Sequence, residues 1–218
     1  MLNKVLIANR GEIAVRIIRA CREMNIRTVA IYSEADKDSL HTKLADEAIC
    51  VGPAGSAKSY LNIKNILEAA SLSGVDSIHP GFGFLSENSN FAKMCEESNI
   101  KFIGPSYKVI DLMGNKSNSK ELMKSAGVPV IPGSEGSLRD LEDAKKIAKE
   151  IGFPIMLKAA AGGGGKGIRL VEEMKDLESA YNIVKQEAKV SFNDDEIYME
   201  KFIVNPRHVE IQILADEH

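Results

Sequence analysis

Apolar and polar positions in the first hundred residues alternate between two spacings, which predicts strands followed by helices. Residues 4–8 form a short apolar run typical of a buried parallel strand, and the turn Asn9-Arg10-Gly11 follows it. Four apolar side chains then recur at helical spacing: Ile13, Ile17, Cys21 and Met24. A second apolar run at 28–32 completes an expected βαβ unit.

The same alternation continues to residue 106. Further strands are expected at 48–51, 77–78 and 101–103, and further helices at 63–73 and about 87–97. We therefore expect an α/β domain over residues 1–106, with a parallel sheet and helices on both faces. A dinucleotide-binding fingerprint needs three glycines after the first strand, whereas residues 9–14 contain one, so a dehydrogenase is disfavoured.

Residues 107–131 predict two short linker helices, with Ser117 able to cap the second, and then an extended connector interrupted by prolines. Residues 132–203 mix helical and strand spacing, which predicts an α+β domain. Its expected elements are helices at 141–151 and about 174–190, and strands that end at Lys158, pass through Leu170 and span 196–201.

The last fifteen residues, 204–218, contain a strict alternation at 207–214. Three polar side chains share one face and three apolar side chains share the other: His208, Glu210 and Gln212 against Val209, Ile211 and Ile213. We expect this strand to begin a further domain. It should fold back or pair with another molecule, because an unpaired strand edge is prone to association.

Composition describes an ordinary globular protein of 218 residues, with 44% hydrophobic residues, 27% charged residues and a net charge of −3. Such a balance gives no basic surface for nucleic acid. Three widely spaced cysteines, Cys21, Cys50 and Cys95, suggest buried free thiols. No signal peptide and no run of eighteen apolar residues is present, so we expect a cytoplasmic protein without a membrane span.

A glycine-rich hairpin is the main candidate for ligand chemistry. An apolar strand ends at Lys158, four glycines occupy 162–165, Lys166 and Gly167 follow, and a second apolar run begins at Ile168. Bare glycine backbone can approach an anion closely, and flanking lysines supply charge, so phosphate is the expected ligand. No Ser or Thr follows a Gly-Lys pair here, which excludes a P-loop, and a flexible hairpin without a ligand would show the same glycines.

A second glycine-containing loop, His79-Pro80-Gly81-Phe82-Gly83-Phe84-Leu85-Ser86-Glu87-Asn88, leaves the carboxyl end of a strand and enters a helix that Ser86 can cap. Loops in this position bind ligands in open α/β sheets. A tight turn with two core phenylalanines is the simpler explanation, and it accounts for Phe84 and Leu85 by packing alone.

Three motifs together resemble a known family. The pattern aromatic-Pro-three apolars-Lys-small-small-glycines at Phe153 onward resembles the lid of ATP-grasp enzymes, in particular the biotin carboxylase signature. Ile-Ala-Asn-Arg-Gly-Glu-Ile-Ala from Ile7 and the loop from His79 are also similar to biotin carboxylases. The resemblance implies a parallel-sheet, Rossmann-like pre-ATP-grasp domain followed by an α+β ATP-grasp lid, with the ATP-grasp fold incomplete at the end of the chain.

The resemblance also assigns roles to individual residues. Lys116 and Lys158 match phosphate contacts, and Gly164 and Gly165 match a mobile lid that closes over the phosphates. Five residues match positions around the nucleotide: Glu200, Lys201, Phe202 and Ile203 at the adenine, and His208 as a further contact, with Glu210 as a cleft acid. Arg19 and Glu23 match a dimer interface. The resemblance points to no catalytic residue and no metal ligand in this chain.

The implied reaction is that of a biotin carboxylase. ATP activates bicarbonate as carboxyphosphate, whose breakdown carboxylates biotin on a carrier protein, and a carboxyltransferase component then uses the carboxyl group. Magnesium would be needed, with its ligands beyond residue 218, so the fragment is expected to be inactive alone. Acetyl-CoA, pyruvate or another acceptor stays open. Two alternatives also stay open: another ATP-grasp ligase, such as a carbamoyl phosphate synthetase or a purine-pathway synthetase, and a non-catalytic nucleotide-binding module.

Overall fold

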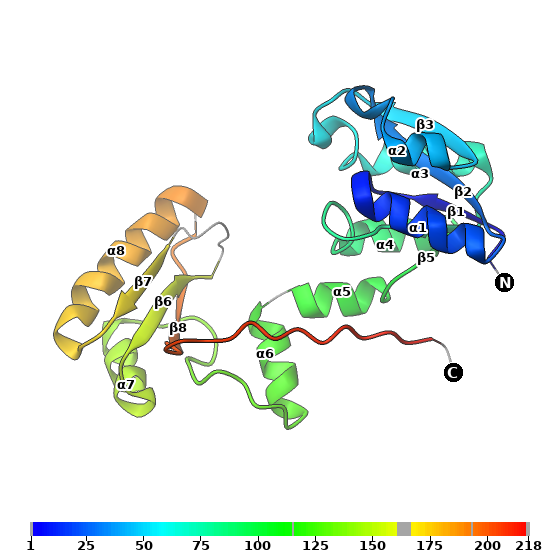
Figure 1. Ribbon diagram of the computed structural model, residues 1–218. Helices are drawn as coiled ribbons and strands as arrows, with labels where there is room; N and C mark the ends of the chain where they lie inside the picture. Colours follow the sequence, from blue (N-terminus) through cyan, green and yellow to red (C-terminus); the bar gives the residue numbers. More distant parts are fainter. Residues whose placement is uncertain (1, 115, 161–166, 193, 217–218) are drawn as a thin grey trace. The chain divides into compact units, whose positions relative to one another are not determined.

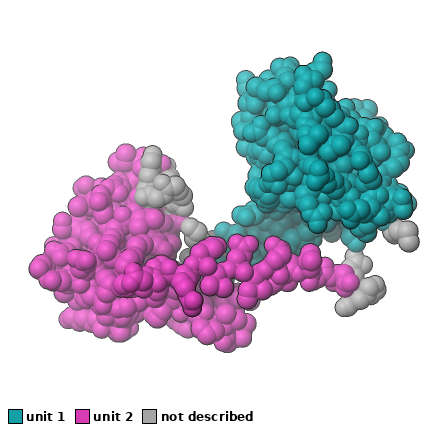
Figure 2. Space-filling view, viewed as in Figure 1, with its two compact units in different colours: residues 1–119 teal, residues 120–218 magenta. Residues whose placement is uncertain are grey.

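The computed structural model describes residues 2–114, 116–160, 167–192 and 194–216, without the side chains of 116–118 and 192. The chain forms two compact units, residues 1–119 and 120–218 (Figures 1 and 2). We describe each unit by itself. The boundary falls inside the linker expected at 107–131, and the finer division into four segments stays a prediction.

Unit 1 contains a five-stranded parallel sheet, as predicted. Its strands are β1 (Lys4–Ile7), β2 (Arg27–Ser33), β3 (Glu47–Gly52), β4 (Ser77–His79) and β5 (Lys101–Phe102), in the order β3-β2-β1-β4-β5 (Figure 1). The order reverses between β1 and β4. The carboxyl ends of these two strands therefore meet at the switch point where open α/β sheets bind ligands.

Helices cover both faces of this sheet, which confirms the Rossmann-like expectation. They are α1 (Gly11–Glu23), α2 (Leu40–Leu44), α3 (Ile63–Ser73) and α4 (Ser89–Glu97). Helix α5 (Tyr107–Gly114) packs against α4, and the one-turn helices are η1 (Glu34–Asp36) and η2 (Ser56–Lys58). Successive residues of β1 face opposite sides. Val5 packs with α1, whereas Leu6 packs with α3 and α4. Helix α6 (Lys116–Ser125) crosses the unit boundary.

Several local predictions for unit 1 were wrong. Met24 lies beyond α1 and is exposed, and the buried stripe is Ala14, Ile17, Ile18 and Cys21. The cap of α4 is Asn88, whose side chain accepts from Phe91 N at 2.8 Å, so Ser86 stays in the loop. Ser117 is the second residue of α6 and therefore does not occupy the cap position. Cys50 is exposed on the edge strand β3, while Cys21 and Cys95 are buried as expected.

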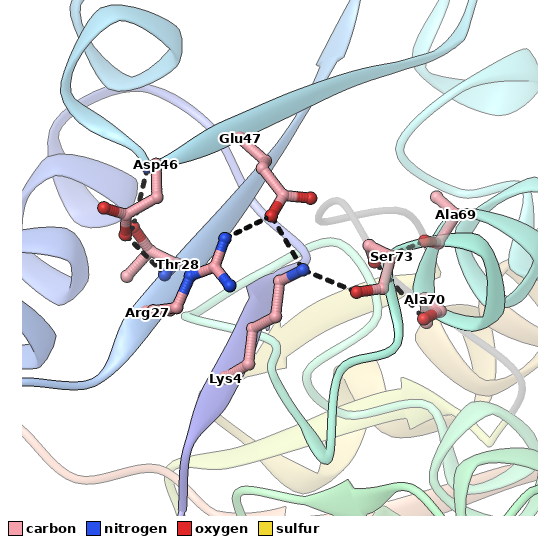
Figure 3. Close-up of polar contacts among 8 residues, drawn as sticks. All are labelled: Lys4, Arg27, Thr28, Asp46, Glu47, Ala69, Ala70 and Ser73. Carbon is pink, nitrogen blue, oxygen red and sulfur yellow. Dashed lines mark hydrogen bonds and ion pairs between the residues drawn. The ribbon is translucent and has the colours of Figure 1, made fainter.

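Ion pairs and hydrogen bonds join the amino-terminal ends of the strands (Figure 3). Glu47 pairs with Lys4 and with Arg27, both at 2.8 Å, and Lys4 Nζ also donates to Ser73 O at 2.6 Å. Thr28 donates to Asp46 through its N–H and its hydroxyl, and these bonds are the largest cause of the lowered pKa of Asp46. The polar side chains at this amino-terminal edge pair with one another. The carboxyl-terminal edge of the sheet is therefore the edge available to bind a ligand.

Unit 2 has two layers. Antiparallel strands β6 (Ile155–Ala159), β7 (Ile168–Val171) and β8 (Ile197–Lys201) lie in the order β7-β6-β8, and helices α7 (Leu141–Ile151) and α8 (Met174–Phe192) pack on one face (Figure 1). Asp140 caps α7 by accepting from Asp143 N. The α+β architecture predicted for residues 132–203 is confirmed.

The strand predicted at 207–214 is not formed in the described structure. The segment has no strand pairing among the described residues, and Val209, Ile211 and Ile213 are exposed. A strand is defined by ladder hydrogen bonds to a neighbour, and an alternating sequence cannot supply that neighbour by itself. Folding back is not observed among the described residues, and pairing with another molecule stays a prediction.

Candidate functional site

The sheet of unit 2 has one face that α7 and α8 leave uncovered. Cross-strand register places six side chains on it, in two rows: Ile168, Lys158 and Tyr198, then Leu170, Met156 and Glu200. We call this the outer face. The alternating residues of the same strands, including Ile155, Leu157 and Met199, are buried against the helices. The outer face combines charged and apolar side chains.

Glu200 is the centre of the charges on the outer face. Its carboxylate oxygens take two different cations: Lys158 Nζ at 2.6 Å from Oε2, and Lys120 Nζ, from α6, at 3.3 Å from Oε1. The Glu200 side chain is only 16% exposed. Burial alone would raise its pKa, but the two lysines outweigh burial and hold the pKa of Glu200 below its usual value. The carboxylate is therefore ionised at neutral pH.

Gly133 makes room for this arrangement. The segment after the connector runs along the free edge of β8, where Ser134 N donates to Met199 O and Leu138 N donates to Ile197 O. A Cβ at Gly133 would lie 2.3 Å from Met199 O and 3.1 Å from Lys120 Nζ. Only glycine lets the backbone come this close to β8 beneath the lysine.

Lys158 and Glu200 on the outer face, counted together with Lys120 from α6, carry one more positive than negative charge. Apolar side chains lie beside the charges, with Ile168 and Leu170 exposed and Met156 half-buried. Burial and the Glu200 charge raise the pKa of Tyr198, so its hydroxyl stays protonated. Such a face suits a ligand that joins an anionic group to a flat apolar one.

The glycine hairpin has the predicted antiparallel form on both sides of its tip. Lys158 pairs with Ile168, and Ala159 N donates to Gly167 O at 2.8 Å. Gly167 has φ +66°, and a Cβ there would lie 2.8 Å from Ala159 Cβ, so glycine is required. Gly164 and Gly165 lie outside the described residues, as does the expected mobility of the tip.

Of the residues expected to contact adenine, Lys201 and Phe202 are already hydrogen-bonded to other parts of unit 2. Lys201 Nζ donates to Gly152 O at 3.2 Å and to Phe153 O at 2.8 Å, away from Glu200. The backbone N–H groups of Lys201 and Phe202 donate to Pro132 O and Pro154 O. Ile203, just beyond β8, is exposed. A base at this strand end would therefore have to use carbonyl groups or the N–H of Ile203.

Of the two remaining predicted residues, the structure places only His208, which is not one of the outer-face side chains. His208 lies in the extended segment with its side chain 90% exposed, 3.6 Å from Glu210. Lys116 is the first residue of α6, and its side chain is outside the described part of the chain. Their roles stay predictions.

In unit 1, the loop at the carboxyl end of β4 is held by Asn9, which follows β1. Asn9 Nδ2 donates to Pro80 O and to Phe82 O, both at 2.8 Å, and its side chain is buried. Gly81 has φ +66°, and a Cβ there would lie 2.8 Å from Asn9 Nδ2. Phe82 is 61% exposed on this anchored loop. The expected core role therefore fails for Phe82.

Phe84 and Leu85 do pack, as predicted. Leu85 is buried, and Phe84 stacks on Tyr60 with ring centroids 5.1 Å apart. The Tyr60 hydroxyl donates to Asp36 at 2.7 Å and accepts from Ser33 N at 2.9 Å. Burial and this bond to Asp36 raise the pKa of Tyr60 to about 12. Through Tyr60, these contacts join the loop after β4 to η1 and to the end of β2.

Sequence reasoning missed Lys120 and Gly133. One signal was available for Lys120, because positions 116 and 120 are four apart in a predicted helix and share a face. Nothing in the sequence marked Gly133, whose role depends on a neighbouring strand 66 residues later.

Comparison with known proteins agrees with both units. Residues 1–110, half of the chain, match the family described as "Biotin carboxylase, N-terminal domain". The chain belongs to this biotin carboxylase family. Residues 115–218 match "Carbamoyl-phosphate synthase L chain, ATP binding domain". The family resemblance inferred from the sequence motifs is thereby confirmed.

Curated relatives of this biotin carboxylase family member share more than half of its residues. Biotin carboxylase 1 of Bacillus subtilis is 56% identical over all of this chain and 48% of its own length. The biotin carboxylase of Haemophilus influenzae is 58% identical over all of this chain and 49% of its own. The chain spans about half the length of the curated relatives it matches.

Solved structures support the fold. A Campylobacter jejuni biotin carboxylase, solved as a complex named for βγ-ATP, superposes with TM-score 0.85 at 56% identity, covering 95% of this chain and 46% of its own. The biotin carboxylase domain dimer of Hydrogenobacter thermophilus 2-oxoglutarate carboxylase, with MgADP, ADP and bicarbonate, gives 0.80 at 53% identity, covering 93% and 45%. Within the described residues, no helix has the length and apolarity to cross a membrane.

Proposed function

We propose that this chain supplies the nucleotide-binding part of an ATP-dependent biotin carboxylase. The observation that carries the proposal is the outer face of unit 2, where Lys158 and Lys120 share the Glu200 carboxylate beside apolar side chains. The match to an ATP-binding domain family over residues 115–218 supports the same assignment.

In the proposed reaction, a bicarbonate oxygen attacks the γ-phosphorus of ATP, the bond to the β-phosphate oxygen breaks, and ADP leaves. The carboxyl group of the carboxyphosphate then passes to N1 of biotin on its carrier protein, its bond to the phosphate oxygen breaks, and phosphate leaves with the N1 proton. This chain's own part is to bind and orient the nucleotide. Positioning and charge neutralisation are what phosphoryl transfer requires of a protein.

We propose roles for individual residues from the outer face and from the family motifs. Lys158 binds phosphate oxygens, and Met156 and Leu170 contact the apolar part of the nucleotide. The carbonyls near Glu200 to Ile203 accept from the base. We assign Lys116, Gly164, Gly165 and His208 to the same site from the family motifs alone.

Magnesium is part of the proposed reaction, but the described residues do not fit it. No group of three or more His, Cys, Asp or Glu side chains among them could hold a metal ion. We therefore assign no metal ligand in this part of the chain and derive no step through the ion.

The proposed partners are the carrier protein, a carboxyltransferase component and a second copy of the same protein. The surface around Arg19 and Glu23 on α1 is the proposed dimer contact. The free cysteines support a cytoplasmic location, where thiols stay reduced.

A carbamoyl phosphate synthetase-like ligase is the second candidate, because the family matched by residues 115–218 carries that name. Both reactions begin with ATP and bicarbonate, so the acceptor distinguishes them. The test is ATP hydrolysis by a protein that extends this chain to its relatives' length. We expect turnover to require bicarbonate and to produce carboxybiotin from free biotin. Carbamoyl phosphate formation from ammonia, without carboxybiotin, would favour the second candidate.

A further inference from the structure

Lys120 and Lys158 approach the same carboxylate but not the same oxygen. Lys158 Nζ lies 2.6 Å from Glu200 Oε2, while Lys120 Nζ lies 3.3 Å from Oε1. The three side chains come from α6, β6 and β8. Because the two contacts use separate oxygens, one lysine can leave Glu200 without disturbing the other.

We propose that Lys120 is a positioning residue that keeps Glu200 paired when Lys158 turns to the phosphates of a bound nucleotide. The inference rests on the proposed function, which gives Lys158 its phosphate role. Without nucleotide, Lys158 is held by Glu200. With nucleotide, Lys158 exchanges one anionic partner for another, and Lys120 remains with the carboxylate.

The burial of Glu200 explains why a second cation is needed. A half-buried carboxylate that loses its cation is costly, because neither water nor another charge compensates it. Burial is the largest single influence on the pKa of Glu200 and would raise it, and the two lysines together reverse that shift. If Lys158 were the sole partner, each nucleotide-binding event would leave Glu200 unpaired. Lys120 lowers that cost.

The local backbone is shaped for the Lys120 contact. Gly133 forms a bridge with Glu200, and a Cβ at Gly133 would approach Lys120 Nζ to 3.1 Å. The ammonium group therefore sits over bare backbone next to the carboxylate. The surplus positive charge of the three groups also favours a polyphosphate over a neutral ligand.

The chain offers a matched control for Lys120. Lys124 lies one turn further along α6, pairs with Glu135, and is 63% exposed. Lys124→Met removes the same charge from the same helix, away from Glu200. We expect Lys120→Met to weaken ATP binding about tenfold, measured by calorimetry, since charge-assisted contacts are lost. We expect Lys124→Met to stay within about twofold, because exposed ion pairs contribute little.

A second pair of variants separates positioning from simple charge loss. Lys120→Arg should restore most of the affinity. In the Lys120→Met background, Glu200→Gln should also restore affinity, because a neutral side chain no longer holds Lys158 or needs a cation. A residue that merely supports the fold would not be rescued by changing its partner. Unchanged ATP affinity in Lys120→Met, or failure of Glu200→Gln to rescue it, would overturn the proposal.

One readout does not depend on nucleotide. A double-mutant cycle between Lys120 and Glu200, measured as unfolding free energy without ATP, should show coupling. Coupling together with no effect of Lys158→Met on ATP binding would refute the proposed function at this face, and the positioning role with it. Absence of coupling, with Lys158→Met still harmful, would refute the role of Lys120 alone.

Discussion

The ammonium group of Lys158 lies 2.6 Å from a carboxylate oxygen of Glu200, diagonally across strands β6 and β8. Lys158 is directly opposite Tyr198, and Glu200 is directly opposite Met156. Diagonal neighbours on one sheet face are within reach of long side chains. A shift of one residue in the register would bury one member of the pair against the helices.

Lys158→Met should weaken ATP binding by about 1.5–3 kcal/mol, the range for hydrogen bonds to charged groups. The loss arises from the missing phosphate contact, while Glu200 keeps Lys120 as its partner. Calorimetric titration with ATP measures the change. Lys145→Met, on α7 and paired with Glu142, is the control and should bind as the parent does. Equal affinities for the two variants would remove Lys158 from the site.

Tyr60→Phe should destabilise unit 1 by about 1–3 kcal/mol, because the buried N–H of Ser33 loses its acceptor. Asp36 keeps Arg10 and the Ser33 hydroxyl as partners. Hydrogen exchange of the amides in β1 and β2 reports the opening free energy of this unit. Tyr107→Phe, which preserves the ring beside Lys108, is the control. A change below about 0.5 kcal/mol would be that of an ordinary surface substitution and would contradict the account.

His41 makes the stability of unit 1 depend on pH. It is buried, with Nε2 3.2 Å from Ile31 O and with no partner for Nδ1 among the described residues. Burial lowers the pKa of His41; the bond to Ile31 O and the Asp36 charge oppose this shift, and Arg10 adds to it. The lowered pKa means that the folded state favours the neutral form of His41. The stability that this gives unit 1 is therefore fully present above pH 6.5, the ordinary pKa of histidine, and is lost as the pH falls below that value.

Hydrogen exchange of the β1 and β2 amides, measured from pH 8 to pH 5 and corrected for the intrinsic exchange rate at each pH, tests whether the stability of unit 1 declines in this way. His41→Gln should reduce the decline. His79, whose pKa is also lowered by burial, should account for what remains. His208→Gln, at an exposed position, should leave the decline as it is in the parent. An unchanged decline in His41→Gln would contradict the assignment.

Much of the fold was predictable because buried parallel strands and amphipathic helices leave strong local patterns. Helices α3 and α7 begin and end where the sequence predicts, and Asn62 and Asp140 cap them. The choice between two neighbouring helix-capping residues was harder to predict. Ser86 and Asn88 are both good caps, and the structure uses Asn88.

Within the candidate site, Lys158 and Glu200 were predictable through the family motifs, but their ion pair was not. Their contact depends on the register of two strands 42 residues apart. Gly133 depends on its approach to β8, which no local pattern marks. For Lys120, the helical spacing from Lys116 indicates a shared helix face but not the carboxylate that it pairs with. The alternation at 207–214 indicates that this segment can form a strand, but it forms one only when a neighbouring strand pairs with it.

The central claim is that ATP binds on the outer face of the β6–β7–β8 sheet. Met156 and Met199 provide its most direct test, because they lie on opposite faces of that sheet, Met156 on the outer face and Met199 buried against the helices. Methyl NMR of methionine-labelled protein, with Met156→Leu and Met199→Leu to assign the two signals, follows both during an ATP titration. We expect the Met156 signal to shift and saturate while the Met199 signal stays in place. A stationary Met156 signal in the presence of bound ATP would contradict the account.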